Sequence, residues 1–454
     1  MNLRSIIKNT RSSLLMFSML LLAVSFVAAQ NDGSQQNTTG RAGTFAIVNA
    51  RIVTVTGAVI ENGTVVIQNG KITAVGAGAS VPSGAERIDG RGLSVYPGMI
   101  DASTNLGLTE IGQGVNASVD VQEVGSMNAN AKAITGVNPH SSHVNVTRVN
   151  GITTVLSMPS GGTVSGQAAV INLNGSTQAD MAVIGQAGLV INFPRVSGGG
   201  GFGGFGRGGG GQQDFNALVR RRDAAVEELK KAFQEVEAYG KALDAYTANR
   251  SLPKPATNLG LEAMIPYVRG QKTIFFTSER DRDIRAVAKF VGEMKIKGVI
   301  VGGQEAWKAA EDLKKNNMAV IYTNIYSLPT RQDDPYDYLY EAPSLMQKAG
   351  VKFAISTGDG GGEVRDLPYH AGIAGAYGLG REEALKSVTI YPAQILGVDD
   401  QLGSIEVGKM ANIVVADGSI LDARTNIKYM FIGGRMIPLT SRHTELFDSF
   451  KDRK

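Results

Sequence analysis

The stretch TIFFTSERDRDIRAVAKFVGEMKIKGVIV, residues 273–301, decides the fold class of this chain. It begins with a short apolar run, Thr273–Thr277, and ends with another, Gly298–Val301. Between them, the apolar residues of Ile284–Met294 are spaced as on one face of an amphipathic helix. Two short strands joined by a helix are typical of parallel pairing with a crossover connection. This stretch therefore predicts an α/β protein with a parallel sheet.

The same alternation of strands and helices extends over residues 97–402. Further short apolar runs predict strands at Gly98–Asp101, Thr153–Ser157, Ala319–Tyr322 and Val351–Ile355. Six or seven such units predict a distorted TIM (β/α)8-type barrel, although the pattern does not yield a clean count of eight strands.

Both ends of the chain have the pattern of β-structure. From Thr44 to Tyr96, apolar and polar residues alternate with period two, and turn residues such as Asn69-Gly70 separate the runs. The pattern returns from Gly403 to Met436. We therefore predict one small β-sandwich, built from residues 44–96 and 403–438, with the barrel inserted between its halves.

Three further segments depart from the barrel pattern. Residues 197–211 are nearly all glycine, which indicates a flexible loop because ordering so many glycines costs much backbone entropy. Residues 215–247 are charged and rich in alanine, and they predict an inserted, solvated helix. Residues 439–454 are expected to be a mobile tail.

The first residues of the chain predict export. Residues 1–29 combine a basic start with an apolar run, Leu14–Ala29, which ends in small residues. A membrane anchor is the alternative, but this run is shorter than the ~20 residues that span a bilayer. We interpret residues 1–29 as a cleavable signal peptide and residues 30–43 as a polar linker. The protein is then expected to be secreted or periplasmic, without a stable membrane span.

Composition excludes several classes of site and partner. The chain has no cysteine, which rules out disulfides, thiol nucleophiles and thiolate metal sites. Its net charge is +4, but three of the positive charges (Arg4, Lys8 and Arg11) lie in the leader. Removing them leaves a charge near +1, so we expect no nucleic-acid binding.

Several phrases of the sequence, in this order, resemble the amidohydrolase superfamily and in particular its imidazolonepropionase-like group. The phrases are Val48–Thr54, Val65–Gly76, Tyr96–Asp101, Tyr391–Gly397 and Leu402–Val415. Each is weak alone, but together they cover both ends of the chain. The resemblance implies a distorted barrel with a β-sandwich built from both termini, and hydrolysis of cyclic amides and related non-peptide C–N bonds.

The resemblance also implies a metal site that this chain does not reproduce. Family enzymes use one or two divalent metals, held by a His-x-His pair, histidines on middle strands and a last-strand aspartate, to make hydroxide from water. In this chain other residues occupy the corresponding positions. Ser103 and Asn105 replace the His-x-His pair, and Thr277 and Gly302 replace the middle histidines. Gly358, followed by Asp359, replaces the aspartate. We therefore expect no cofactor, with residual zinc as the open alternative.

The candidate site residues come from the ends of the expected barrel strands. As catalytic residues we select Asp359, His370 and Asp101, and as substrate-binding residues Ser103, Asn105, Thr277, Arg365 and Tyr369. His370 follows the last strand at an expected helix start, and two acids together can support hydrolysis without a metal. The competing interpretations are ordinary packing for His370 and loop capping for the acids.

The remaining polar candidates have plainer interpretations. His140 and His143 have i, i+3 spacing, but we expect them opposite the active face, as surface or capping residues. Glu279 and Glu305 follow middle strands, where acids at helix starts are common. His443 lies in the tail, and we assign it no role.

Two functions stay open at this point. The chain is either an exported C–N hydrolase with an unusual site, or a non-catalytic pseudo-hydrolase that binds a small molecule or a partner protein. Fold alone does not decide between them, because function depends on the site. A ligand in the barrel mouth, and a homo-oligomer or a complex with an intact relative, are the expected partners.

Overall fold

The computed structural model describes residues 39–111, 119–196, 215–329, 331 and 333–453. The signal peptide, most of the linker and the glycine-rich loop expected from the sequence lie outside these residues. None of the helices in the described ranges combines the length and apolar content that crossing a membrane requires.

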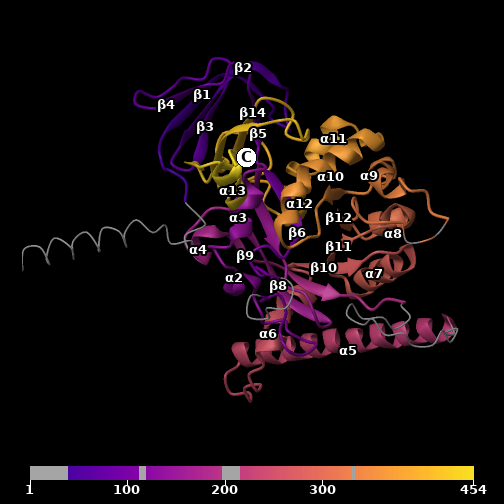
Figure 1. Ribbon diagram of the computed structural model, residues 1–454. Helices are drawn as coiled ribbons and strands as arrows, with labels where there is room; N and C mark the ends of the chain where they lie inside the picture. The colour runs from indigo at the N-terminus through magenta and orange to yellow at the C-terminus, as the bar shows by residue number, and fades with distance from the viewer. Residues whose placement is uncertain (1–38, 112–118, 197–214, 330, 332, 454) are drawn as a thin grey trace, which may run out of the picture. The chain divides into compact units, whose positions relative to one another are not determined.

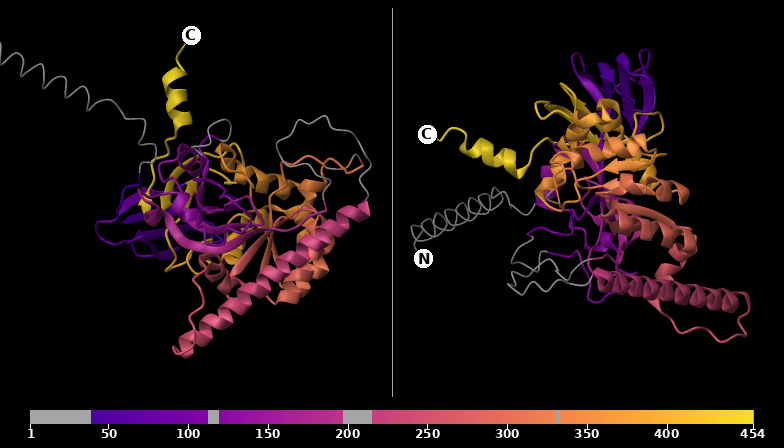
Figure 2. Two further views of the ribbon diagram at one scale, coloured as in Figure 1. Left: turned by 90° about the horizontal axis from the view of Figure 1, so that it is seen from below. Right: turned by 90° about the vertical axis from the view of Figure 1, so that its right-hand side faces the viewer.

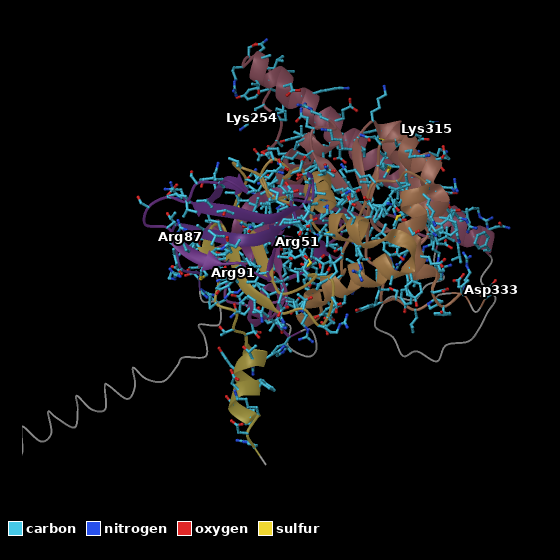
Figure 3. The ribbon with its side chains drawn as sticks, turned by 90° about the horizontal axis from the view of Figure 1, so that it is seen from above. Arg51, Arg87, Arg91, Lys254, Lys315 and Asp333 are labelled. Carbon is cyan, nitrogen blue, oxygen red and sulfur yellow. The ribbon has the colours of Figure 1, made fainter. Side chains whose placement is uncertain are left out.

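One eight-stranded sheet combines strands from both chain ends, and Figure 1 shows these strands side by side in indigo and yellow. Its strands are β1 (Phe45–Ile52), β2 (Ile60–Gln68), β3 (Lys71–Gly76), β4 (Glu86–Asp89), β5 (Ser94–Pro97), β14 (Ile413–Ala416), β15 (Ile427–Ile432) and β16 (Arg435–Met436). The N-terminal and C-terminal segments join where β5 pairs antiparallel with β14. Charged side chains such as Arg87 and Arg91 are exposed on this sheet (Figure 3).

The second eight-stranded sheet forms the barrel, in the order β13-β12-β11-β10-β9-β8-β7-β6. Its strands are β6 (Met99–Thr104), β7 (Ile152–Ser157), β8 (Val164–Asn172), β9 (Ala182–Asn192), β10 (Thr273–Ser278), β11 (Lys297–Gly302), β12 (Ala319–Tyr322) and β13 (Phe353–Ile355). Seven strands run parallel, and β8 runs antiparallel to both of its neighbours. The sequence pattern missed β8 and β9, which is why eight strands could not be counted.

Helices surround the barrel (Figures 1 and 2). Those from α2 to α9 lie between its strands in sequence, and the helices from η3 onward follow β13, with α13 projecting at the C-terminal end. They are α2 (Ala133–Gly136), α3 (Ser142–Arg148), α4 (Gln178–Met181), α5 (Phe215–Ala248), α6 (Leu259–Val268), α7 (Asp281–Met294), η2 (Ala306–Ala309), α8 (Ala310–Lys315), α9 (Tyr338–Lys348), η3 (Gly362–Asp366), α10 (Leu367–Ala374), η4 (Gly375–Leu379), α11 (Arg381–Lys386), α12 (Ile390–Leu396) and α13 (Arg442–Phe450). The segment expected to be a mobile tail therefore contains a helix, α13.

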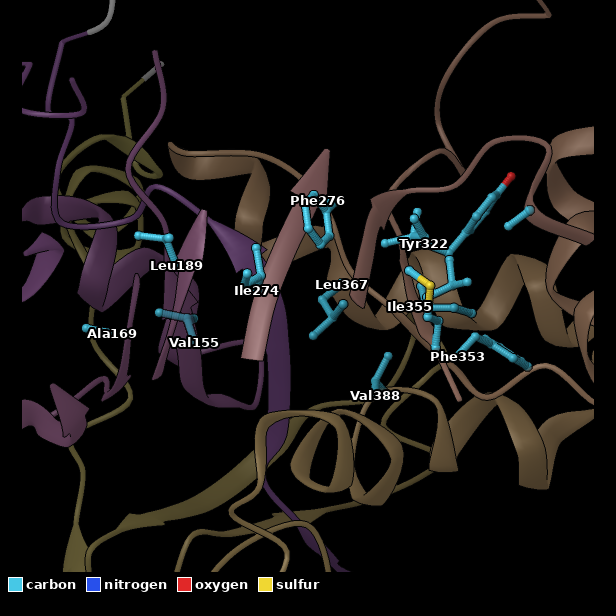
Figure 4. Packing of buried hydrophobic residues seen from close by; sticks show 14 of the residues in the cluster. Val155, Ala169, Leu189, Ile274, Phe276, Tyr322, Phe353, Ile355, Leu367 and Val388 are labelled. Atoms are coloured by element: carbon cyan, nitrogen blue, oxygen red, sulfur yellow. The ribbon is translucent and has the colours of Figure 1, made fainter. Parts of the chain in front are cut away.

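Alternation along the strands separates two apolar layers. On β10, Ile274 and Phe276 belong to the core between strands and helices, where they pack in one cluster with Leu367 and Val388 (Figure 4). The residue between them, Phe275, belongs to a second cluster that also contains Ile100 and Ile321. Because successive strand residues point to opposite faces, Thr277 shares the side of Phe275.

The long helix α5 corrects the expectation of a solvated insertion. Leu229, Phe233 and Val236 are buried along one stripe of it. The Phe233 ring lies 5.2 Å from that of Phe290 on α7, in an edge-to-face arrangement. This spacing of three and four residues buries one apolar face of the helix, while its charged residues stay exposed.

Candidate functional site

The first and last strands of the barrel are joined through residues that follow β13. The N–H of Gly358 donates to the carbonyl of Ser103 at 3.1 Å, and the N–H of Asn105 donates to the carbonyl of Asp359 at 3.3 Å. The structure thus brings together four of the residues selected from the sequence: Asp101, Ser103, Asn105 and Asp359. We call this region the closure, and it lies at the carboxyl end of β6 and β13.

Asp101 is the central group of the closure. Its side chain is 0% exposed. It accepts hydrogen bonds from the Ser356 hydroxyl, from the Thr357 hydroxyl at 2.5 Å and from the Ser103 N–H at 3.2 Å. Burial raises the pKa of Asp101 to about 6, and these hydrogen bonds act against the rise. The carboxyl group is enclosed by the two strands that it links, so its contacts are structural.

Asp359 and Asn105 also contact the protein's own backbone. The Asp359 carboxylate is exposed and accepts a hydrogen bond from the N–H of Gly360 at 2.7 Å. A side chain at Gly360 would overlap the Asn105 amide, so the loop packs directly on Asn105. Asp359 contributes to the closure through its carbonyl, while its carboxylate extends into solvent.

Thr277 lies in a different part of the barrel mouth, beside β9. Its hydroxyl donates to the side-chain oxygen of Asn192 at 2.9 Å. The Asn192 amide in turn donates to the carbonyl of Gly162 at 2.8 Å. Thr277 is therefore held by neighbouring chain segments, and in the part of the chain that the structure describes its side chain makes no hydrogen bond with Asp101 or Asp359.

Glu279 occupies the space beside Gly302, the position where the family resemblance implies a histidine. Gly302 has φ of +106°, a backbone conformation that favours glycine, and a Cβ built on it would overlap the Glu279 carboxylate. One carboxylate oxygen of Glu279 accepts from the Asn324 amide at 2.8 Å and from the N–H of Gln304 at 3.2 Å. The missing side chain at position 302 thus makes room for an acid from the neighbouring strand.

Glu279 faces a cavity of about 660 Å³ at the carboxyl ends of β9, β10 and β11. We call this cavity the mouth pocket, and its lining residues are Asn192, Phe193, Arg195, Val196, Thr277, Ser278, Glu279, Arg280, Asp283 and Gln304. Glu279 is open to the pocket, yet protein surrounds it on most sides, and this burial raises the pKa of Glu279. The Asn324 and Gln304 hydrogen bonds and the positive charge of Arg195 oppose that rise.

The mouth does not have the donors that the family's metal site needs. The residues at the expected positions offer two hydroxyls, one amide, a glycine and an offset, exposed aspartate, and neutral imidazole is absent from all of them. No group of three or more His, Asp or Glu side chains in the described part of the chain is arranged to hold a metal ion. These residues do not fit the implied metal.

The position of His143 corrects one expectation. Its Nε2 lies 2.9 Å from the carbonyl of Glu110, which follows β6. Its ring also lies beside Gly361, in the loop after β13: a Cβ atom added to this glycine would be 3.9 Å from His143 Cε1. Both neighbours follow strand ends, so His143 lies on the carboxyl-end rim. The expectation of the opposite face was wrong because a helix in a βα unit begins where the preceding strand ends.

His370 is buried among the helices that follow β12 and β13. It is 4% exposed, and its ring lies 4.1 Å from that of Tyr326. Burial lowers the pKa of His370 to about 4, so the ring is neutral at pH 7. Its Nδ1 has no hydrogen-bond partner in the described residues.

Arg365 and Tyr369 are bound into the same helical region. Arg365 Nη1 lies 2.9 Å from Nδ1 of His443, which gives that tail histidine a contact that the sequence did not indicate. The Tyr369 hydroxyl lies 3.5 Å from the Asn150 amide. Neither residue lines the mouth pocket.

From the sequence, Glu279 was interpreted as an ordinary acid at a helix start and was not selected as a site residue. Arg195 and Arg280 were not predicted to be site residues either. The signal that could have singled out Glu279 was the glycine at position 302, one strand away. A glycine in place of a ligand side chain leaves a space that some neighbouring group must fill.

Comparisons with known proteins agree with this fold. Residues 266–437 match the amidohydrolase family model. A solved amidohydrolase from Thermotoga maritima MSB8 superposes with a TM-score of 0.75 at 24% identity, covering 88% of this chain and all of that one. A prolidase complexed with N-methylphosphonate-L-proline gives 0.52 at 18% identity, covering 87% and 99% of the two chains. Phenylurea hydrolase B gives 0.52 at 15% identity, covering 87% and 97%.

No curated protein matches the chain in sequence. These three structural likenesses are below 25% identity, so they establish the fold alone. Together with the family-model match, they confirm the resemblance to the amidohydrolase superfamily and the predicted fold class, a distorted barrel with a β-rich domain from both termini. The imidazolonepropionase-like group stays a prediction.

Proposed function

We propose that this chain, which has the fold and part of the sequence signature of amidohydrolases, is an exported protein that binds a small molecule in the mouth pocket. In this proposal it has lost the metal-dependent hydrolysis of that superfamily. The observation that carries the proposal is the place of the Glu279 carboxylate, which fills the side-chain space at Gly302. Export is supported by the leader-like sequence of residues 1–29.

A catalytic metal contributes much more to the reaction rate than a general base does, so its loss favours binding over catalysis. A bound divalent metal lowers the pKa of water from 15.7 to about 7 and also polarises the carbonyl. A positioned general base alone contributes typically ~10²- to 10⁴-fold. A carboxylate in the mouth therefore replaces only a small part of what the metal supplies.

A second candidate is metal-independent hydrolysis of non-peptide C–N bonds, with Glu279 as general base. The observation that favours it is the raised pKa of Glu279, because a carboxylate with a higher pKa is a stronger base towards water. The nearby positive charge of Arg195 would then stabilise negative charge developing on the carbonyl oxygen. Asp101 is unsuited to this role because the closure encloses it.

Elemental analysis and activity assays of the mature protein test the proposal together. We expect less than about one tenth of a divalent metal per chain after purification in metal-containing buffer. We also expect saturable binding of at least one member of a panel of cyclic imides and N-acyl amino acids, without turnover.

The two other outcomes are distinct. Stoichiometric zinc, with amide hydrolysis that a chelator abolishes, would overturn the proposal. Chelator-resistant hydrolysis that the Glu279→Gln variant loses, and that Asp359→Ala and His370→Ala retain, would establish the second candidate instead.

A further inference from the structure

Two of the acids around the mouth pocket, Asp283 and Glu305, already have cationic partners. Asp283 lines the pocket, and its Oδ1 lies 3.4 Å from Arg222 Nη1. Glu305, at the adjoining cavity, lies 2.8 Å from Lys308 Nζ and 3.2 Å from Arg331 Nη2. These side chains therefore offer no strong charge to a ligand.

Two arginines of the same pocket have no such ion-pair partner among the described residues. Arg195 and Arg280 line the pocket and are exposed. Among the described residues, neither guanidinium makes an ion pair or hydrogen bond, and Arg195 acts on Glu279 only through its charge. A guanidinium presents N–H groups in a planar fork that matches a carboxylate. The pocket thus has an excess of positive charge in the form that binds carboxylates.

Glu279 supplies an unused acceptor beside this pair. One of its oxygens, Oε2, takes the hydrogen bonds from Asn324 and Gln304. The other, Oε1, accepts no hydrogen bond from the described residues and lies against Gly302. A ligand with an N–H group at this point would give Oε1 a donor.

We propose that the mouth pocket recognises N-acyl amino acids, with Arg195 and Arg280 binding the carboxylate and Glu279 accepting the ligand's amide N–H. This inference rests on the proposed function, because it specifies what the small-molecule site binds. It makes Arg195 and Arg280 the residues that determine specificity.

Charge and size both support this ligand class. A neutral ligand would leave the positive charge of the pocket uncompensated, and Glu279 would repel a phosphate dianion more strongly than a carboxylate. A cavity of about 660 Å³ lies in the usual range of ~300–1,000 Å³ for small-molecule sites. A ligand with one carboxylate and one adjacent N–H matches the available groups.

Calorimetric titration with matched ligand pairs tests the proposal. The probes are N-acetyl-L-alanine, N-acetyl-L-leucine and N-acetyl-L-phenylalanine, each compared with its C-terminal amide, at two salt concentrations. We expect at least one acid to bind at least tenfold more tightly than its amide, with a difference that shrinks at high salt. Equal affinity for acids and amides, or no binding of any acid, would overturn the proposal.

Variants assign the preference to named side chains. Arg195→Met and Arg280→Met should each weaken binding of the acid at least tenfold and leave binding of the amide within twofold. Arg282→Met is the matched control, since this arginine stacks on Phe215 at 4.6 Å and does not line the pocket. It should change neither affinity by more than twofold, and a loss as large as that of the other two variants contradicts a local contact.

The role of Glu279 is tested with N-methylated acids, which lack the N–H. The protein should bind them at least fivefold less tightly than the parent acids, and Glu279→Gln should reduce this difference. Zinc-dependent turnover of the acids would defeat the proposed function while leaving the carboxylate preference standing. Binding of neutral amides alone would defeat only this inference.

Discussion

Asp101 lies within barrel strand β6 and Glu279 directly follows barrel strand β10, and the surroundings of the two acids differ. Asp101 is fully buried and accepts hydrogen bonds from the hydroxyls of Ser356 and Thr357, which follow the last strand. Glu279 is open to the mouth pocket and keeps one oxygen without a donor among the described residues. An acid on or next to a barrel strand can therefore either join two segments of the barrel or face a ligand. What decides between these roles is the neighbouring strand, which in one case supplies hydroxyls and in the other a glycine.

The largest expected effect is the loss of stability on replacing Asp101 by alanine. Two buried hydroxyl donors would lose their acceptor, at about 1–3 kcal/mol for each unsatisfied group. We expect the free energy of unfolding to fall by about 3 to 4 kcal/mol, measured by chemical denaturation at pH 7. Glu279→Gln should cost less than about 1 kcal/mol, because it keeps an acceptor and is open to water. Similar losses in the two variants would remove the distinction between the closure and the pocket.

The next largest expected effect is a pH dependence of the free energy of unfolding, caused by the titration of Asp101. Its pKa is raised from 3.8 to about 6, so the folded state holds the proton more tightly than the unfolded state. The resulting stabilisation is fully present below pH 3.8 and is lost as the pH rises to about 6, by at most about 3 kcal/mol. Denaturation of the wild type and of Asp101→Asn at pH 4.5 and 7 measures it. The difference between the two proteins should change in this direction, and a flat difference would contradict the assignment.

A third effect isolates the contact between Gly302 and Glu279. Gly302→Ala introduces both a strained backbone and an overlap with Glu279, so we expect a loss of about 2 to 3 kcal/mol. Gly408→Ala is the matched control, because Gly408 has φ of +95° with nothing within 4 Å of a built Cβ. It should cost about 1 kcal/mol. The extra loss at Gly302 should disappear in a Glu279→Ala background, and its persistence there would show that Glu279 does not fill this space.

The smallest effect is expected at Asp359. The carboxylate of this residue is exposed, and its part in the closure is made by the backbone carbonyl. Asp359→Ala should therefore change the free energy of unfolding by less than about 0.5 kcal/mol, measured as for Asp101→Ala. A loss close to that of Asp101→Ala would place the Asp359 carboxylate inside the closure.

Most of the fold could be predicted from local patterns. The expected strand Thr273–Thr277 corresponds to β10 and the helix Ile284–Met294 to the larger part of α7, because buried faces repeat at the periods of strand and helix. The β8 and β9 pair was missed. β8 is buried along its whole length although it contains Ser165 and Gln167, and glycines interrupt both strands, so no alternation of apolar and polar residues marks them.

The candidate site could be predicted only in part. Asp101, Ser103, Asn105 and Asp359 do lie together, since the first and last strands of a barrel are neighbours. His370 follows the last strand as expected, but its side chain is buried in the helical layer, where it packs against Tyr326. Arg195 carries no sequence signal, because it follows β9, a strand that the pattern did not reveal.

The sequence by itself determined the α/β class, the origin of the β-rich domain in both chain ends, and the lack of imidazole donors at the family's ligand positions. These follow from periodicity and residue identity, which act over a few neighbouring residues. Only the tertiary structure decided that Asp101 is sealed and that Glu279 faces the pocket. The reason is that the solvation of a carboxylate depends on atoms brought close by folding, such as the Ser356 hydroxyl, which is 255 residues from Asp101 in the chain.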